Sequence, residues 1–124
     1  MSKIKCVNRW LVLKPNSPEK ITKGGIIVPD DEVERNDRGV IVEIAEAWSN
    51  SEGETQPTLM SVGEEVFYNK DRGTEIIEKD ILNEYGIKEG EELIYLMYDD
   101  LYFVTKSNKE GDRKRKQYAK QHGI

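Results

Sequence analysis

The sequence predicts a mainly β protein, a small β-barrel that completes its burial by forming oligomers. Short runs of β-branched and aromatic residues alternate with frequent turn residues, as in barrels and sandwiches. The chain has 124 residues, enough for one domain with a modest core. Apolar residues make up 36% of it and charged residues 35%, so this core must be small.

Six apolar runs are the expected strands. In the second, Val40, Val42 and Ile44 share one face of the strand and Glu43 points to the other. The runs at residues 93–98 and 101–105 carry apolar residues on both faces of the strand. We therefore expect the core to cover one face and a neighbouring subunit to cover the other. The six lie at residues 4–13, 40–46, 66–68, 75–78, 93–98 and 101–105.

Two further elements are expected between these strands. Residues 47–57 read as a hairpin-like excursion with Glu52 and Gly53 at its tip, and Trp48 is expected to be buried at its start. One or two helical turns are predicted at residues 80–86. There Asp80 suits an N-cap and Gly86 suits the position after the helix.

A long polar connection, at about residues 15–38, separates the first two strands and contains an apolar triplet. Ile26, Ile27 and Val28 stand between the pair Gly24-Gly25 and Pro29. One interpretation is a short strand of the domain's own sheet. However, connections longer than about 12–15 residues are usually functional or disordered. The triplet is therefore predicted to lie in an exposed loop and to bind an apolar site on a partner.

Charge is distributed unevenly along the chain. Residues 106–124 contain seven basic and two acidic residues, a net charge of +5, against −10 for residues 1–105. An acidic body argues against a nucleic-acid interface on the main domain. Residues 107–124 have almost no apolar content and are expected to form a mobile tail. Their basic run at 113–116 is predicted to be solvated rather than to bind RNA or an acidic surface.

The sequence contains no recognisable catalytic, cofactor or metal motif. Its single histidine, His122, lies in the tail, so one chain cannot build a histidine-based triad or zinc site. Gly24-Gly25 lacks the residues of a phosphate loop. The acidic runs at 30–32 and 99–100 lack calcium-loop spacing. Neither enzymatic activity nor a cofactor nor a bound metal is predicted.

The expected location is the cytoplasm. One cysteine, Cys6, excludes an intrachain disulfide and suits a reducing compartment, and we expect it to be half-buried in the first strand. The N-terminus lacks the apolar run of a signal peptide. No stretch approaches the 18 or so apolar residues of a membrane span.

The order of these parts resembles the GroES-type co-chaperonins, the heptameric lids of the chaperonin folding chamber, over about residues 4–105. Six parts of the chain are similar to motifs of that family. They are the opening strand at Asn8-Arg9-Trp10-Leu11-Val12, the mobile loop at Lys23-Gly24-Gly25-Ile26-Ile27-Val28-Pro29, the following strand at Arg38-Gly39-Val40-Ile41-Val42, the roof hairpin at Glu52-Gly53-Glu54 with Pro57, Val62-Gly63-Glu64-Glu65-Val66-Phe67-Tyr68, and the closing runs at 91–97 and 100–103.

Departures from the family pattern are also present. The proline usual before the first Asp-Arg is missing, Asn8 replaces the aspartate, residues at about 80–90 form an insertion, and the basic tail is additional. Such divergence suits a virus-encoded member, acting in the host cytoplasm, as well as a cellular one.

The resemblance implies a GroES-like barrel domain at residues 1–106 and a flexible basic tail at 107–124. Within the barrel it places a mobile loop at about 15–38 and a roof hairpin at about 47–60. The implied chaperonin-binding residues are Gly24, Gly25, Ile26, Ile27, Val28 and Pro29, and the roof residues are Glu52, Gly53 and Glu54.

The implied partners are a GroEL-type chaperonin, further copies of this chain in a heptameric ring, and encapsulated unfolded client proteins. ATP would be bound by the chaperonin and not by this chain. Two alternatives stay open from the residues alone: a small β-barrel adaptor that uses the loop, and a nucleic-acid-binding module that uses the tail.

Overall fold

The computed structural model describes residues 4–16, 36–49, 51–121 and 123. Its strands are β1 (Trp10–Pro15), β2 (Arg38–Ile44), β3 (Ala47–Ser49), β4 (Thr55–Pro57), β5 (Glu65–Tyr68), β6 (Thr74–Glu75), β7 (Ile94–Met97) and β8 (Leu101–Lys106). Its helices are α1 (Lys79–Glu84), the short 3-10 helix η2 (Tyr98–Asp100) and α2 (Lys109–Gln121).

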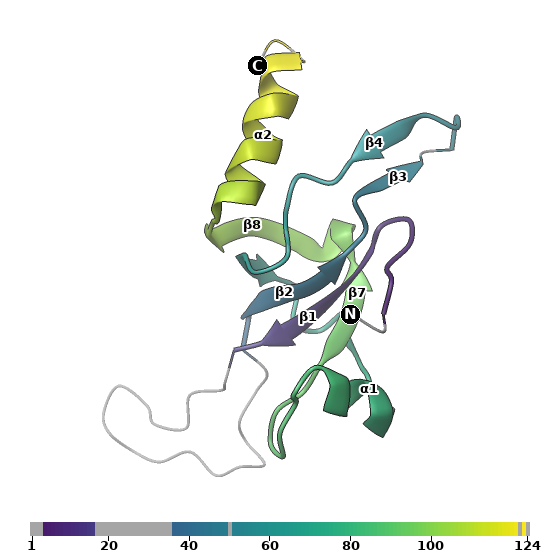
Figure 1. Cartoon of the computed structure of the whole chain (residues 1–124), viewed down its shortest axis with the longest axis vertical. Helices are drawn as coiled ribbons and strands as arrows, with labels where there is room; N and C mark the ends of the chain where they lie inside the picture. Colours follow the sequence, from purple (N-terminus) through teal and green to yellow (C-terminus); the bar gives the residue numbers. More distant parts are fainter. Residues whose placement is uncertain (1–3, 17–35, 50, 122, 124) are drawn as a thin grey trace.

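The strands form one curled antiparallel sheet and one hairpin (Figure 1). The sheet has six strands in the order β6-β7-β1-β2-β5-β8, and β3 pairs with β4 separately. The mainly β fold that the sequence predicts is therefore confirmed. Within the described residues, β6 and β8 are the two edges of the large sheet, so β8 has one strand partner.

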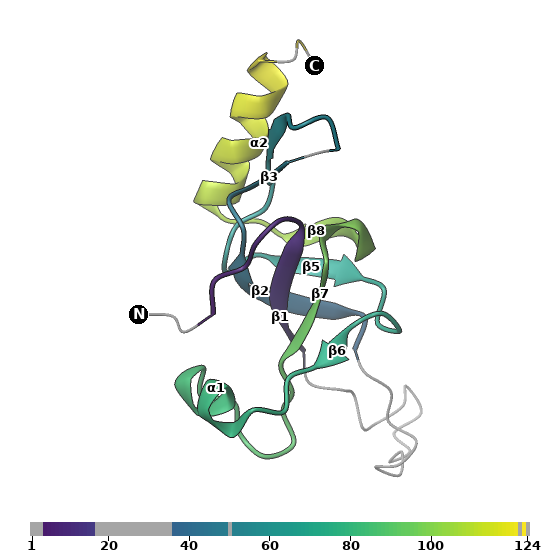
Figure 2. The same cartoon turned by 90° about the vertical axis from the view of Figure 1, so that its right-hand side faces the viewer.

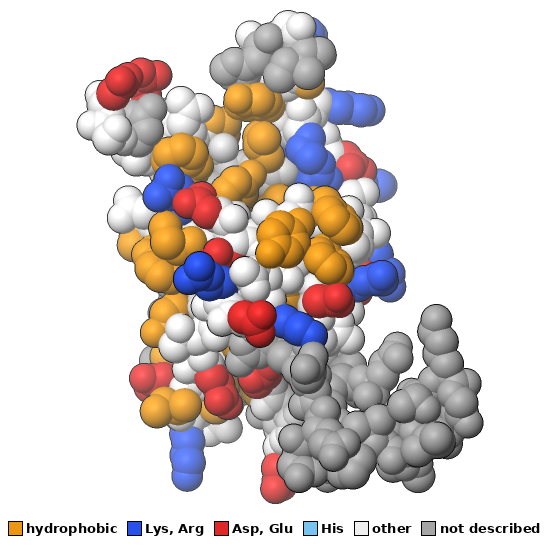
Figure 3. Space-filling model, turned by 180° about the vertical axis from the view of Figure 1, so that it is seen from behind, with side chains coloured by type: hydrophobic (Ala, Val, Ile, Leu, Met, Phe, Trp, Pro, Cys, Tyr) orange, Lys and Arg blue, Asp and Glu red, His pale blue; other side chains and the backbone are white. Residues whose placement is uncertain are grey.

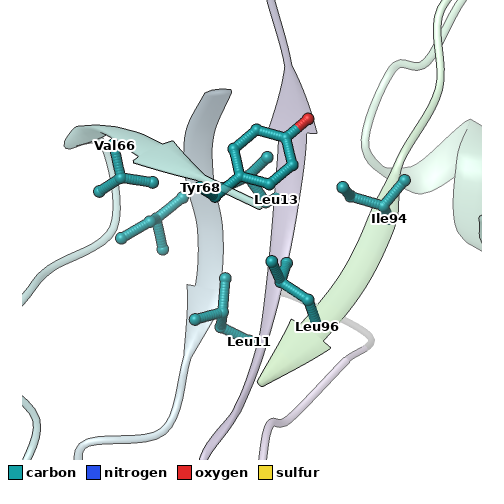
Figure 4. Packing of buried hydrophobic residues seen from close by; sticks show 7 residues of the cluster. Leu11, Leu13, Val66, Tyr68, Ile94 and Leu96 are labelled. Atoms are coloured by element: carbon teal, nitrogen blue, oxygen red, sulfur yellow. The ribbon is translucent and has the colours of Figure 1, made fainter. Parts of the chain in front are cut away.

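The main core lies on one face of this sheet, where side chains from β1, β2, β5 and β7 meet (Figure 4). The strands alternate, so Leu11 and Leu13 of β1 point to the same side. The core's buried members are Leu11, Leu13, Ile41, Val66, Tyr68, Ile94 and Leu96. Burial of each large apolar side chain in this cluster stabilises the sheet by about 1.5–3 kcal/mol.

A second cluster covers the opposite face of β1. Val12 packs there with Ile76 and Leu93, and residues of the α1 region lie over them. The Tyr85 hydroxyl donates to the Glu43 carboxylate at 3.0 Å, which ties the segment after α1 to β2. The short helix that the sequence predicts is thus present. Its N-cap, however, is Glu78, and Asp80 lies in its first turn.

A β-bulge changes which residues of β2 face the core. The pairing register between β1 and β2 shifts within the ladder. Ile41 and Ile44 therefore both contribute to the main core, whereas Val42 packs on the second cluster. The prediction that Val40, Val42 and Ile44 share one face is wrong, because an extra residue at a bulge interrupts the alternation of sides.

The first strand begins later than the sequence predicts. One strand is expected at residues 4–13, but Asn8 adopts a φ of 54° in a turn and β1 starts at Trp10. Asparagine tolerates this left-handed conformation better than most residues. Cys6 is half-buried as expected, although it precedes the strand. Burial and the nearby Glu43 raise the pKa of its thiol to about 11, so it is protonated at neutral pH.

The C-terminal region differs most from the expectation. Residues 109–121 form helix α2, where low apolar content predicts a mobile tail. The helix docks through polar contacts: Arg115 donates to the fully buried Glu64 carboxylate at 2.7 Å. A buried carboxylate needs such partners, and apolar content does not report them. The division of the chain into domains at residue 106 stays a prediction.

The elements are distributed over two ends of an elongated molecule (Figures 1 and 2). Helix α2 and the β3–β4 hairpin lie at one end, whereas α1 lies at the other, together with the end of β1 and the start of β2. No helix within the described ranges is long and apolar enough to cross a membrane.

Candidate functional site

The candidate binding segment is the connection between β1 and β2. The residues predicted to bind a partner, Gly24, Gly25, Ile26, Ile27, Val28 and Pro29, lie outside the described residues. The structure does describe the stem from which this connection departs. Pro15 of β1 pairs with Gly39 of β2, and the Asn16 N–H donates to the Arg38 carbonyl at 2.9 Å. Both ends of the connection are therefore held side by side on a paired ladder.

Glu65 crosslinks this stem to the edge strand β8. One of its carboxylate oxygens accepts a hydrogen bond from the Asn16 side chain at 2.7 Å, and the other accepts from the Thr105 hydroxyl at 2.7 Å. These two bonds lower the pKa of Glu65 below its ordinary value, with Thr105 the larger cause. The group is therefore ionised at neutral pH and holds three chain segments together.

The other side of the stem is fixed by β5. The Tyr68 hydroxyl donates to the Asn36 carbonyl at 2.7 Å, and the Tyr68 N–H donates to the Asp37 carbonyl at 3.0 Å. The Asn36 side chain accepts from the Arg38 N–H at 2.9 Å, which forms a local turn as the chain enters β2. Tyr68 is 1% exposed, so it couples the stem directly to the main core.

Gly39 is required by close packing in the stem. A Cβ atom at this position would lie 2.3 Å from a methyl carbon of Leu13 and 2.9 Å from the Lys14 carbonyl oxygen. Neither separation is compatible with normal contacts. Gly39 is therefore required where the connection joins the sheet.

A second candidate site, the β3–β4 hairpin, is at the opposite end of the molecule (Figure 1). Its turn contains the predicted tip residues Glu52, Gly53 and Glu54, all of them exposed. Gly53 has a φ of 82°, a conformation that favours glycine. The hairpin predicted at residues 47–57 from the turn signal at Glu52 and Gly53 is present, since β3 pairs with β4.

Contacts at its base orient the hairpin. The Thr58 hydroxyl lies within hydrogen-bond distance of the Ala45 and Glu46 carbonyls, at 2.7 and 2.9 Å. Trp48, which is expected from the sequence to be buried, is half-buried, and the guanidinium carbon of Arg9 lies 5.2 Å from its ring centroid. This cation–π contact joins the hairpin to the turn before β1.

The exposed edge of the sheet carries an aromatic cluster. Phe67 of β5 stacks on Phe103 of β8 with ring centroids 4.9 Å apart, and Tyr102 lies 5.7 Å from Phe67. Tyr102 and Phe103 are 56% and 55% exposed. Hydrophobic side chains gather in patches on the face shown in Figure 3. Exposed aromatic residues on an edge strand are typical of an association surface.

A second apolar surface lies beside the N-terminal segment. A groove of about 370 Å³ is lined by residues that include Ile4, Val7, Trp10 and Tyr95. Val7 is 63% exposed, and Trp10 packs edge-to-face on Tyr95 at 5.8 Å. The molecule thus presents apolar surfaces at β8 and at the segment before β1.

Sequence reasoning did not identify the residues that hold the stem, namely Asn16, Asn36, Glu65 and Tyr68. The available signals were weak. Asparagines next to strands indicate turns, and Glu65 is an acidic residue directly before the apolar run at 66–68, a place where a buried hydrogen-bonded group can stand. Neither signal names the partner, which is 49 residues away in the case of Asn16 and Glu65.

These features define a class of small β protein that carries a long connection and a hairpin on opposite ends of one rigid sheet. Residues 3–105 match the family model described as chaperonin 10 Kd subunit. The chain therefore belongs to this family.

Relatives of known function agree with this assignment. The co-chaperonin GroES of Rickettsia bellii is 36% identical over 94 residues, which cover 76% of this chain and 88% of the relative. The co-chaperonin GroES of Rickettsia prowazekii is 37% identical with the same coverage. That of Rickettsia conorii is 42% identical over 66 residues, 53% of this chain and 70% of the relative. The family consists of non-enzymatic chaperones, and this chain is a co-chaperonin. Helix α2 lies beyond the matched residues.

Proposed function

We propose that this co-chaperonin caps the ATP-bound ring of a GroEL-type chaperonin in the cytoplasm and encloses a chamber in which client proteins fold. The binding element is the apolar triplet (Ile26, Ile27 and Val28) together with Gly24, Gly25 and Pro29. The chaperonin binds the ATP, and this chain supplies the lid. Family membership and the position of the triplet in the β1–β2 connection are the observations that carry the proposal.

The stem supports this role because it is rigid at the point of departure. A segment that is anchored at both ends can present an apolar triplet without disturbing the core to which it is attached. Burying the triplet would return about 1.5–3 kcal/mol per residue. Ordering the segment would cost about 1–2 kcal/mol for each residue fixed. A single segment therefore binds weakly, which suits a lid that must be released.

Ring assembly supplies the missing affinity. Linking even two binding segments can raise avidity by about 10²–10⁴. We propose a heptameric ring in which β8 of one copy associates with the segment before β1 of the next. The contact involves the segment before β1 and not β1 itself, because β1 lies between β2 and β7 and both of its edges are paired. Val7 in the segment before β1 and the aromatic side chains Tyr102 and Phe103 on β8 are exposed, and they are the surfaces proposed for this contact.

The decisive experiment is the Ile27→Asp variant. It should leave the ring mass and melting temperature unchanged and abolish ATP-dependent chaperonin binding, because a carboxylate would have to enter an apolar site. An unpaired buried charge costs several kcal/mol at each site, and every copy in the ring would carry one. Native mass spectrometry, thermal unfolding and a chaperonin pull-down with and without ATP measure the three properties.

The control is Lys23→Ala, which changes a flanking charge and should weaken binding little. If Ile27→Asp lowers the melting temperature and breaks the oligomer, the triplet is an internal strand instead. Unchanged chaperonin binding by Ile27→Asp would also reject the proposal.

A further inference from the structure

Helix α2 is built into the fold at a defined position. The Asn108 side-chain oxygen accepts from the Gly111 N–H at 2.9 Å, which caps the helix, and it also accepts from the Ser61 hydroxyl at 2.6 Å. Gly111 is buried, and a Cβ atom there would lie 2.2 Å from a Glu64 carboxylate oxygen. The helix backbone therefore rests directly on this carboxylate.

Arg115 fixes the second turn of the helix. Its guanidinium donates to both oxygens of Glu64, at 2.7 and 3.1 Å, and to the Leu59 carbonyl at 2.8 Å. Lys114 donates to the Met60 carbonyl at 3.2 Å. Burial alone would raise the pKa of Glu64, but the bonds from Arg115 and from two backbone N–H groups outweigh it and lower the pKa. The ion pair is therefore intact at neutral pH.

The opposite face of α2 carries a basic stripe, formed by Lys109, Arg113, Lys116 and Lys120. Spacings of four, three and four residues align these side chains along one side of a helix. All four are exposed, and Glu110 pairs with Arg113. Together with Asp112 and Gln117, the four basic residues line a shallow depression of about 730 Å³. Because the docked face is fixed, the stripe is presented in one orientation.

An acidic surface lies at the same end of the molecule as the basic stripe of α2. Glu52 and Glu54 are exposed in the turn of the β3–β4 hairpin. Hairpin and helix lie at the same end of the long axis (Figures 1 and 2). In a ring whose axis follows this long axis, the helix of one copy and the hairpin of the next lie at the same height. Rotational symmetry then repeats the contact around the ring.

We propose that the basic stripe of α2 binds the acidic hairpin turn of the neighbouring copy and so strengthens the ring on its hairpin side. This inference rests on the ring assembly of the proposed function. The partner is a second copy of this chain rather than a nucleic acid, since residues 1–105 carry a net charge of −10, which repels a polyanion.

The test is a charge-reversal cycle on the full chain. Lys116→Glu/Lys120→Glu should raise the protein concentration at which the ring half-dissociates by about tenfold at low salt, and less at high salt. Glu52→Lys/Glu54→Lys should do the same. Combining the four changes in one chain should restore the wild-type value, because each interface again joins opposite charges. Mass photometry over a dilution series measures this concentration.

The matched control is Lys79→Glu/Lys88→Glu, which makes the same change in net charge at the α1 end, and which should leave ring dissociation unchanged. Circular dichroism should show equal helix content in all variants. If the wild type forms a ring that caps the chaperonin, and Lys116→Glu/Lys120→Glu dissociates at the same concentration as the wild type, only the present inference is overturned. A monomeric wild type would overturn the ring proposal as well.

A labelled single-stranded RNA provides the remaining discrimination. The wild-type ring should not bind it at physiological salt. If the RNA binds, and binding is lost in Lys116→Glu/Lys120→Glu while ring dissociation is unchanged, the stripe is a nucleic-acid surface and the inference is wrong.

Discussion

At the scale of single residues, Glu64 determines where the C-terminal helix lies. Its side chain is fully buried, and it accepts hydrogen bonds from Arg115 and from the N–H groups of Ser61 and Asn108. Every described buried side-chain polar atom has such a partner. A carboxylate satisfied from three separate positions specifies one geometry, because each donor must approach from its own direction.

The first prediction concerns the glycine that faces this carboxylate. Gly111→Ala should lower the free energy of unfolding by about 1–3 kcal/mol through overpacking, although alanine is intrinsically the better helix former by about 1 kcal/mol. Denaturant unfolding measures the change. In a Glu64→Ala background the same substitution should cost much less, because the carboxylate that it meets is gone. Equal costs in both backgrounds would show that the close approach is not what requires glycine.

A second prediction concerns the pH dependence that Glu65 produces. Hydrogen bonds from Thr105 and Asn16 lower its pKa in the folded state. Its contribution to stability is therefore complete above the ordinary glutamate pKa of about 4.3 and is lost as the pH falls below that value. Glu65→Gln should lower the melting temperature at pH 7 and reduce the further fall on acidification to pH 3. Glu89→Gln, at an exposed turn, serves as control and should behave as the wild type.

At the scale of elements, the sequence predicts most strands, the β3–β4 hairpin and the short helix α1, because each depends on local signals. Turn residues and β-branched runs located β2, β5, β7, β8 and the hairpin. The start of β1 and the bulge opposite it could not be predicted in this way. Both are set by pairing with distant strands, whose register has no local signature.

Helix α2 shows a second reason for such failures. Its residues lack the apolar face by which amphipathic helices are recognised. Its docking partner, Glu64, is 51 residues away from Arg115, and Gly111 would normally argue against a helix. Polar docking of this kind becomes visible only when the fold places the buried carboxylate opposite the helix.

The third prediction follows from that docking. Deleting residues 107–124, which the sequence alone predicts to be harmless, should lower the free energy of unfolding because Glu64 loses its partner. We expect a loss of about 1–3 kcal/mol, since the Arg115 side chain is 31% exposed and water can partly replace it. Replacing Glu64 with glutamine in the truncated chain should recover part of this loss. Unchanged unfolding after truncation would instead support an independent tail.

At the scale of the whole molecule, the stem and the β3–β4 hairpin lie at opposite ends of the structure. The stem holds the proposed chaperonin-binding segment at one end, and the hairpin and α2 occupy the other. The main core and the bonds through Glu65 and Tyr68 connect them. Residues Gly24–Pro29 lie outside the described structure, so their role stays a prediction. What the structure adds is the way in which their attachment points are fixed.

The last prediction tests whether the exposed edge of this sheet is the ring contact. Phe103→Asp should convert the ring to monomers, because it places a charge in the exposed aromatic cluster at the β8 edge. The fold itself should survive: Phe103 is 55% exposed, and losing its stack on Phe67 costs about 0.5–1.5 kcal/mol. Native mass spectrometry at micromolar concentration and thermal unfolding separate these effects.

Ile77→Asp, at an apolar side chain that is 74% exposed after β6, provides the control and should leave the ring intact. A ring that persists in Phe103→Asp would mean that the copies associate through another surface, and chaperonin capping by monomeric Phe103→Asp would show that the avidity of a ring is not needed.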